Sequence, residues 1–518
     1  MSSTSPTTVD ALTAYGPVSG LIDNGIASFR GIPYAAAPVG PNRFGPPVPP
    51  APWQGVLAAH EFGPTPPQPR LKGKLGELFH NPVVPGDGYL NLNVWTPDVN
   101  AAGAPVLVWI HGGAFTTGSS AVRTYDGATF ARDGVVCVTI NYRLGVDGFA
   151  YLQDAPAPAN RGLLDQIAAL EWVRDNIANF GGDPDDVTVA GESAGAMSVL
   201  TLLSAETRLF HKAIAESGTA HIGQTVRDAA LVTAAVATRL GVEPTAQALA
   251  AVDITALIAA QAEVSDDVTT TADPQRYGAS TIASCGMSFL PVLDGEVIPQ
   301  LPIDAIAEGR GADVPLLIGT TAEEFRVFVV PTPMVSWPGA QPFRTRTEAY
   351  GAPAGFYDRY AETNVEPYVR NAPSGVACAT LTDRMFRIPT CRIAEARAEA
   401  SAATYVFEFG WRSPATPNAV GVKLGACHSL PLPFAWDTLD NPDSREFTGP
   451  NPPQELADAL HARWVEFATT GELSAWAPYN TIDRPVMTFH RDNRPGDVIV
   501  QDPRRDEREI WKDELNLS

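Results

Sequence analysis

Gly191-Glu192-Ser193-Ala194-Gly195 is the stretch of the sequence whose residue types and spacing point most directly to chemistry. A run rich in β-branched residues, 187–190, precedes this G-x-S-x-G pattern, and small and apolar residues at helical spacing follow it. Strand, sharp turn and helix in that order are the context of a nucleophile elbow, which exposes a serine hydroxyl at the edge of a sheet. The pattern alone also fits an ordinary turn whose serine caps a helix. The presence of partner residues for catalysis therefore has to distinguish a catalytic serine from a helix cap.

Nucleophilic acyl transfer by a serine needs a base, a group that orients the base, and donors for the oxyanion. In an elbow-type enzyme the chain order is serine, acid, histidine. Residues 314–321 read as a buried strand, and Glu323 and Glu324 follow directly after it. Either glutamate satisfies the requirement for an acid at the end of a sheet strand.

The sequence contains eight histidines, and only three of them follow these glutamates. We expect His461 to lie on the surface of an amphipathic helix, and His490 to end an edge strand. His428 follows a strand and lies in a loop, which is where the base of such a site belongs. Order and position therefore favour His428.

The elements around these residues indicate an α/β protein. Residues 105–110, 134–140 and 187–190 are continuous apolar runs, typical of strands covered on both faces, and 163–180 carries a helical stripe. This alternation predicts a mostly parallel sheet, and sites in such sheets lie at the carboxyl ends of the strands. Residues 1–60 suggest an antiparallel edge. We expect one domain over residues 1–518, with helical insertions near 224–290 and 330–400.

Composition narrows the functional classes. The formal net charge of −22 argues against nucleic acid or an anionic membrane surface as a partner, because both would repel the chain. No window approaches 18 uninterrupted apolar residues, and the amino terminus lacks the pattern of a secretion signal. Five widely spaced cysteines without a C-x-x-C pair make a zinc site or disulfide framework improbable. We expect a cytoplasmic protein without metal or cofactor.

Several ordered motifs together resemble the type-B carboxylesterases, the family that includes cholinesterases and bacterial p-nitrobenzyl esterases. The matching segments are 29–35, 92–97, the His-Gly-Gly stretch at 111–113, 141–145, 162–166, 180–184, 191–195 and 467–471. The resemblance implies the α/β-hydrolase fold, with a large, mostly parallel sheet, helices on both faces and helical insertions over the site. It also implies Ser193 as nucleophile, Glu324 as acid and His428 as base, with oxyanion donors at Gly113, Ala114 and Ala194.

Other positions are predicted from their neighbourhood. A substrate pocket is expected from the apolar residues next to these segments, namely Phe115, Phe149, Met197, Phe289, Phe325 and Phe328. Glu192 either disfavours anionic substrates or is solvated, and Ser217 matches a family position that could hydrogen-bond the acid. Compared with eukaryotic members, the chain lacks the cysteine expected near 87–90, and no tryptophan stands near His80, where cholinesterases bind choline.

The sequence thus predicts a serine carboxylesterase that acts on esters of small or aromatic alcohols through an acyl-enzyme. Its partner would be a small-molecule ester, and the protein would be a monomer or small homo-oligomer. Two alternatives use the same fold. One is an amide or carbamate hydrolase with the same machinery, and the other is a non-catalytic cholinesterase-like binding module.

Overall fold

The computed structural model describes residues 7–363 and 372–512, and thirteen strands within these ranges form one sheet. In spatial order they are β1 (Thr7–Thr13), β2 (Gly16–Asp23), β3 (Ile26–Pro33), β5 (Asn91–Thr96), β7 (Val136–Ile140), β6 (Ala104–Ile110), β8 (Gly182–Glu192), β9 (Lys212–Glu216), β12 (Leu316–Thr321), β13 (Thr404–Phe409), β14 (Pro485–Phe489) and β15 (Asp497–Gln501), with β4 (Leu57–Ala58) paired to β2.

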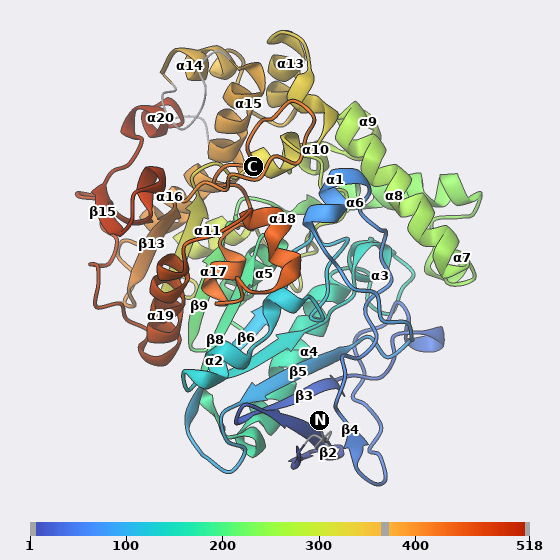
Figure 1. The fold of residues 1–518 in the computed structure, drawn as a ribbon. Helices are drawn as coiled ribbons and strands as arrows, with labels where there is room; N and C mark the ends of the chain where they lie inside the picture. Colours follow the sequence, from blue (N-terminus) through green and yellow to red (C-terminus); the bar gives the residue numbers. More distant parts are fainter. Residues whose placement is uncertain (1–6, 364–371, 513–518) are drawn as a thin grey trace.

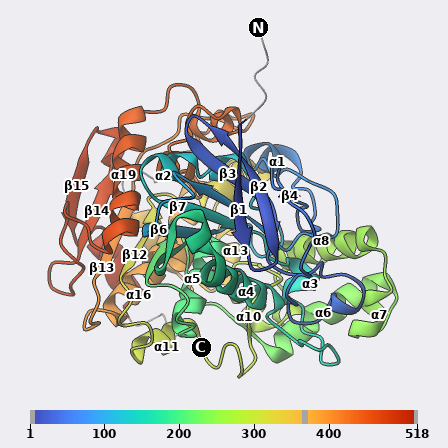
Figure 2. The same ribbon diagram turned by 90° about the horizontal axis from the view of Figure 1, so that it is seen from below.

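The centre of the sheet is parallel and its ends are antiparallel. All neighbours from β7 to β14 run parallel, whereas β1, β2, β3, β5 and β7 pair antiparallel in succession, as does β15 with β14. Figure 2 shows the amino-terminal strands in blue and β13–β15 in orange and red at the other end of the sheet. The prediction of a large, mostly parallel sheet with an antiparallel amino-terminal edge is confirmed.

Helices cover both faces of this sheet, because successive side chains of its central strands point to opposite sides. In β6, Val108 and Ile110 belong to one apolar core, and Leu107 and Trp109 belong to a second. The first core takes side chains from α4 (Arg161–Asn176), α5 (Ala194–Ser204), α6 (Val226–Leu240), α8 (Ile254–Thr271), α11 (Pro302–Ala307) and α16 (Ile388–Ala396). The second takes them from α2 (Ala128–Arg132), α17 (Leu432–Ala435) and α19 (Gln454–Thr470).

The segments 224–290 and 330–400, in which we expect insertions, contain mainly helices where the structure describes them. Between 224 and 290 lie α6, α7 (Ala246–Ala250), α8, α9 (Pro274–Tyr277) and α10 (Ala279–Ala283). Between 330 and 400 lie α13 (Gln341–Ala349), α14 (Phe356–Thr363), α15 (Pro373–Thr382), a π-helical turn (Asp383–Arg387) and α16; residues 364–371 are outside the described residues. In Figure 1, α13–α15 lie at the end of the molecule opposite the amino-terminal strands.

Short elements complete the described chain. They are β10 (Gln224–Thr225), which pairs with β11 (Val292–Leu293), and the helices α1 (Gly73–Leu78), α3 (Gly145–Phe149), α12 (Arg326–Val329), α18 (Arg445–Thr448) and α20 (Arg505–Ile510). None of the helices in the described ranges combines the length and apolar character that crossing a bilayer requires.

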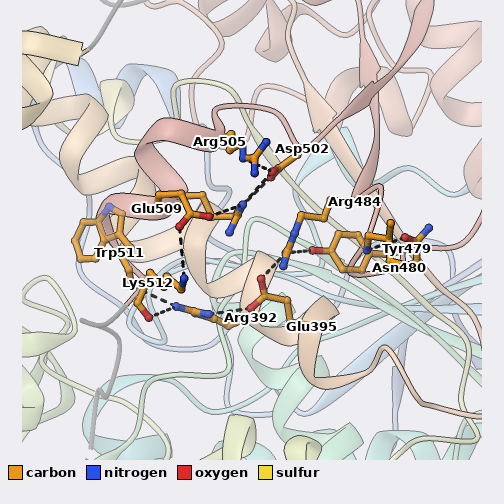
Figure 3. Close-up of polar contacts among 12 residues, drawn as sticks. Arg392, Glu395, Tyr479, Asn480, Arg484, Asp502, Arg505, Glu509, Trp511 and Lys512 are labelled. Carbon is orange, nitrogen blue, oxygen red and sulfur yellow. Dashed lines mark hydrogen bonds and ion pairs between the residues drawn. The ribbon is translucent and has the colours of Figure 1, made fainter.

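Hydrogen bonds and an ion pair connect α16 to the carboxyl-terminal part of the chain (Figure 3). The guanidinium of Arg392, on α16, donates to the Lys512 carbonyl at 2.9 Å and to Glu395 at 2.9 Å. Arg484 also contacts Glu395 and donates to the Tyr479 hydroxyl at 2.8 Å. The Arg392 contact joins the residues after α20 to α16, and the Arg484 contact joins the residue before β14 to the same helix.

A fully buried ion pair fixes α4 against the end of β7. Arg143 donates to both carboxylate oxygens of Asp165 at 2.8 and 2.7 Å, and both side chains are completely inaccessible to solvent. A further N–H of the guanidinium donates to the carbonyls of Arg43 and Gly45. Because the charges are paired and hydrogen-bonded, removing one partner would leave the other buried without compensation.

We predict that Asp165→Ala lowers the free energy of unfolding by about 3–5 kcal/mol, the usual effect of breaking a buried pair. The control is Asp175→Ala, since Asp175 pairs with Arg174 on the same helix while both side chains are 52% exposed. An exposed pair contributes at most about 1 kcal/mol. Urea unfolding followed by circular dichroism measures both changes, and equal effects of the two substitutions would contradict the prediction.

Candidate active site

Ser193 lies in a strained turn between β8 and α5. Its φ of 56° and ψ of −125° place a non-glycine residue in a region that L-residues avoid, as the elbow motif requires. A Cβ on Gly191 would lie 2.5 Å from the Gly195 carbonyl carbon, and one on Gly195 would lie 2.0 Å from the Ile110 carbonyl oxygen. Glycine at 191 therefore lets the turn close on the start of α5, and glycine at 195 lets it approach the end of β6.

Glu324 and His428 are joined by a short hydrogen bond. His428 Nδ1 lies 2.7 Å from Glu324 Oε2, and the two side chains are 3% and 0% exposed. The other oxygen, Oε1, accepts from the Ser217 hydroxyl and from the Thr321 backbone N–H, each at 2.6 Å. The carboxylate is thus held by a hydroxyl and an amide while it faces the imidazole.

Glu323 points to a different part of the protein. Its Oε2 accepts from the Ala426 backbone N–H at 2.9 Å, and its carboxylate lies 3.6 Å from Arg326 and 3.4 Å from Arg412. The sequence alone left both glutamates open. In the structure Glu324 contacts His428, whereas Glu323 forms ion pairs with Arg326 and Arg412.

The three predicted oxyanion donors lie around the turn. Gly113 and Ala114 follow β6 with φ of 114° and 52°, and Ala194 begins α5. Within the described residues, the backbone N–H groups of all three have no protein acceptor. A Cβ built on Gly112 would lie 3.0 Å from the Ser193 Cβ, so this loop passes directly beside the serine. Free amides from this loop and from the start of α5 suit a developing negative charge.

Glu192 contacts the far side of the His428 ring. Its Oε1 lies 3.1 Å from His428 Nε2 and accepts from the Ser429 hydroxyl at 2.7 Å. Glu192 is 3% exposed, so it is not the solvated neighbour that was one of the two predictions. Among the described contacts there is no hydrogen bond between Ser193 Oγ and His428 Nε2. The nitrogen that would receive the serine proton is turned toward Glu192.

Buried charges shift the protonation of this cluster. Burial disfavours the charged imidazolium, but the field of Glu192 and the hydrogen bond to Glu324 outweigh it, and the pKa of His428 is raised. Burial also raises the pKa of Glu192, against the opposing effects of His428 and Ser429. Neighbouring Glu216 is wholly buried. Its burial and the nearby carboxylates raise its pKa to about 8, although a hydrogen bond from Trp464 acts in the opposite direction.

A cavity of about 570 Å³ opens above these groups. Ser193, Glu192, Gly113, Ala114 and His428 line it. Three predicted pocket residues line it as well, Met197, Phe325 and Phe328, and the Phe328 ring lies 5.4 Å from the His428 ring. The cavity is thus apolar near the imidazole and offers hydrogen-bond donors at the serine.

Other predicted positions lie elsewhere. Phe115, Phe149 and Phe289 do not line this cavity; they are buried in the first core, where the Phe115 ring packs on Phe149 at 4.8 Å. They flank site segments in sequence, but their side chains pack into the first core instead of the cavity. His111 is fully buried and stacks on Tyr142, and burial lowers its pKa to about 4.

The prediction that His461 lies on the surface is wrong. The side chain is 3% exposed, its Nδ1 lies 2.8 Å from the Ala435 carbonyl, and its Nε2 lies 3.1 Å from Asp133. The cause is that α17 packs on this face of α19, so a polar residue at helical spacing finds buried partners instead of water.

Several residues that line the cavity were not predicted from the sequence. Met385 and Phe386 enter it from the π-helical turn, and the Phe386 ring lies 5.0 Å from the His428 ring. Arg346 and Tyr350 enter from α13 and the turn that ends it. Ser429, the contact of Glu192, directly follows His428, so its position was a usable signal. The others carry no motif.

The chain is similar to known proteins over nearly its whole length. The sequence model described as Carboxylesterase family matches residues 7–511. Para-nitrobenzyl esterase of Bacillus subtilis is 36% identical, over 96% of this chain and 97% of that protein. Phenmedipham hydrolase of Pseudarthrobacter oxydans is 33% identical, over 92% and 94% of the two chains.

Solved structures are similar over the same extent. The carboxylesterase EST55 of Geobacillus stearothermophilus at pH 6.2 superposes with a TM-score of 0.82 at 34% identity, covering 97% of this chain and 100% of that one. A PNB esterase gives 0.80 at 33% identity, covering 97% and 99%. The predicted α/β-hydrolase fold is confirmed. The chain belongs to the carboxylesterase family, and it is a carboxylic ester hydrolase.

Proposed function

We propose that the chain hydrolyses carboxylic esters through an acyl-enzyme on Ser193, with His428 as general base and Glu324 as the group that orients it. The observation that carries the proposal is the continuous series of contacts from Ser217 through Glu324 to His428, which ends at the cavity that Ser193 lines. Each role follows from the chemistry of the side chain and its partner.

In the first step His428 Nε2 accepts the proton of Ser193 as Oγ attacks the ester carbonyl. Because Nε2 faces Glu192 in the described structure, the imidazole has to exchange this contact for one to the serine. The carbonyl oxygen becomes an oxyanion beside the free amides of Gly113, Ala114 and Ala194. His428 then protonates the leaving alcohol, and water repeats the sequence on the acyl-enzyme.

The walls of the cavity favour esters of small or aromatic alcohols. A volume of about 570 Å³ accommodates an acyl group together with one aromatic ring. The Phe328 and Phe386 rings beside His428 offer apolar surface to either part.

The first prediction concerns the nucleophile. We expect the wild-type protein to hydrolyse p-nitrophenyl esters from acetate to decanoate with an optimum at a chain length set by the cavity, and Ser193→Ala to lose this turnover. Release of p-nitrophenolate measures the rate, and circular dichroism verifies that both proteins are folded. Equal rates in the two proteins would remove Ser193 from this role.

The second prediction separates the two glutamates. Glu324→Gln should lower kcat by roughly 10³–10⁴, because the amide no longer selects the correct tautomer or stabilises the imidazolium. Glu323→Gln, the matched control one residue away, should retain most of the turnover, since its carboxylate faces Arg326 and Arg412. The opposite ranking in steady-state kinetics would transfer the role to Glu323.

The third prediction is a pH profile. The base must be neutral, and its pKa is raised above 6.5, so kcat/KM should increase with pH through a midpoint above 6.5. Glu192→Gln removes a negative charge that favours the imidazolium, and the midpoint should therefore move to lower pH. A midpoint that stayed in place or moved upward in this variant would show that Glu192 does not set the protonation of His428.

A further inference from the structure

Arg346 is a cation in the cavity wall that has no carboxylate partner among residues 7–363 and 372–512. It lies on α13 and contacts the rings of Tyr350 and Trp337, with its guanidinium carbon 5.0 and 5.8 Å from their centroids. Its Nε is buried and has no hydrogen-bond acceptor among the described residues, and no ion pair of Arg346 is present there. A buried N–H that is left unpaired destabilises the free protein, so an acceptor from a bound molecule would be favourable.

The same helix provides a contrast. Arg344, two residues earlier, has a bidentate contact with Asp358 on α14 and does not line the cavity. The chain has 58 acidic and 36 basic residues, so carboxylates to neutralise an arginine are abundant. Arg346 is nonetheless left with aromatic faces only, which hold a guanidinium in place without neutralising it.

The acidic residues of the cavity wall are occupied elsewhere. Glu192 is engaged by His428 and Ser429 beside the serine. Asp443 lies 3.3 Å from His80 and 3.9 Å from Arg123. The wall also contains Ser265 and Thr269 of α8, and the Thr269 carbonyl accepts from the hydroxyl of Tyr350, whose ring Arg346 contacts. The charge of Arg346 is therefore available to a ligand.

We propose that Arg346 makes the site selective for esters that carry a carboxylate at a distance from the scissile bond. A guanidinium presents paired N–H donors that match a carboxylate, and the partly desolvated cavity strengthens that contact. Glu192 disfavours negative charge at the reacting end, whereas Arg346 favours it at the wall formed by α13. The selectivity rests on the proposed function, because it concerns the substrate of the same serine.

The experiment compares isosteric pairs of esters. One pair places the charge on the acyl side, mono-p-nitrophenyl adipate against p-nitrophenyl 6-methylheptanoate. The other places it on the alcohol side, 4-carboxybenzyl acetate against 4-isopropylbenzyl acetate. The kcat/KM of each ester is measured for the wild type, Arg346→Met and the control Arg344→Met, all verified as folded by circular dichroism.

We expect the wild type to prefer the carboxylate ester in at least one pair. Arg346→Met should lower kcat/KM for that ester about 10- to 100-fold, the usual effect of losing a hydrogen bond to a charged group, and leave its neutral partner nearly unchanged. Arg344→Met should change neither. Arg346→Lys, which keeps the charge without the fork, should retain an intermediate preference, and it serves as the test variant if the methionine variant does not fold.

The outcomes distinguish the two levels of the proposal. The selectivity would be overturned, and the proposed function left intact, if Ser193 is required for hydrolysis of all esters but the wild type does not prefer a carboxylate. The same conclusion would follow if the Arg346 variants lose equal activity on both members of a pair. The proposed function would be overturned, and the selectivity with it, if the Ser193→Ala variant still hydrolyses the esters. It would also be overturned if the wild type hydrolyses none of them.

Discussion

The close approach of the Ser193 turn to the end of β6 is the constraint on which the site depends. A Cβ at Gly195 would lie 2.0 Å from the Ile110 carbonyl oxygen, and a Cβ at Gly218 would lie 2.5 Å from that of Ala196. The two glycines therefore let the start of α5 pack closely against the end of β6 and against the segment that follows β9. This contact brings the loop with Gly113 and Ala114 beside the serine. The backbone N–H of Ser193 donates to the Glu216 carbonyl at 2.9 Å, which joins the turn to β9.

Behind the turn, three buried carboxyl groups share a small volume with one imidazole. Glu192, Glu216 and Glu324 are at most 3% exposed, yet each accepts a hydrogen bond, from Ser429, Trp464 and Ser217 respectively. Burial and the neighbouring carboxylates raise the pKa of Glu216 to about 8, which favours its protonated form. A neutral Glu216 limits the repulsion among the three groups. The negative charge that remains lies on either side of His428, where it supports an imidazolium.

The sequence was informative where local chemistry and chain order decide the structure. The glycines around Ser193, the buried strands and the helix that follows the turn all have local signatures, and the fold they predict is confirmed. Local signals could not separate Glu323 from Glu324, because both follow β12 and only the position of Arg326 and Arg412 turns one of them away. The prediction that His461 is exposed was wrong for a related reason, because helical periodicity does not say which face of α19 is covered by α17.

The cavity walls were the least predictable part, because they come from the insertions. Phe386 reaches His428 from the π-helical turn, and that turn is held by the buried pair of Asp383 and Arg387, with two contacts of 2.6 Å. Tyr360 of α14 donates to the same carboxylate, and Arg387 donates to the Pro503 carbonyl before α20. The position of an aromatic ring above the imidazole thus depends on contacts with α14 and with the carboxyl-terminal segment. Contacts with residues as distant in sequence as Tyr360 and Pro503 leave no pattern near Phe386, although they position a ring that lines the cavity.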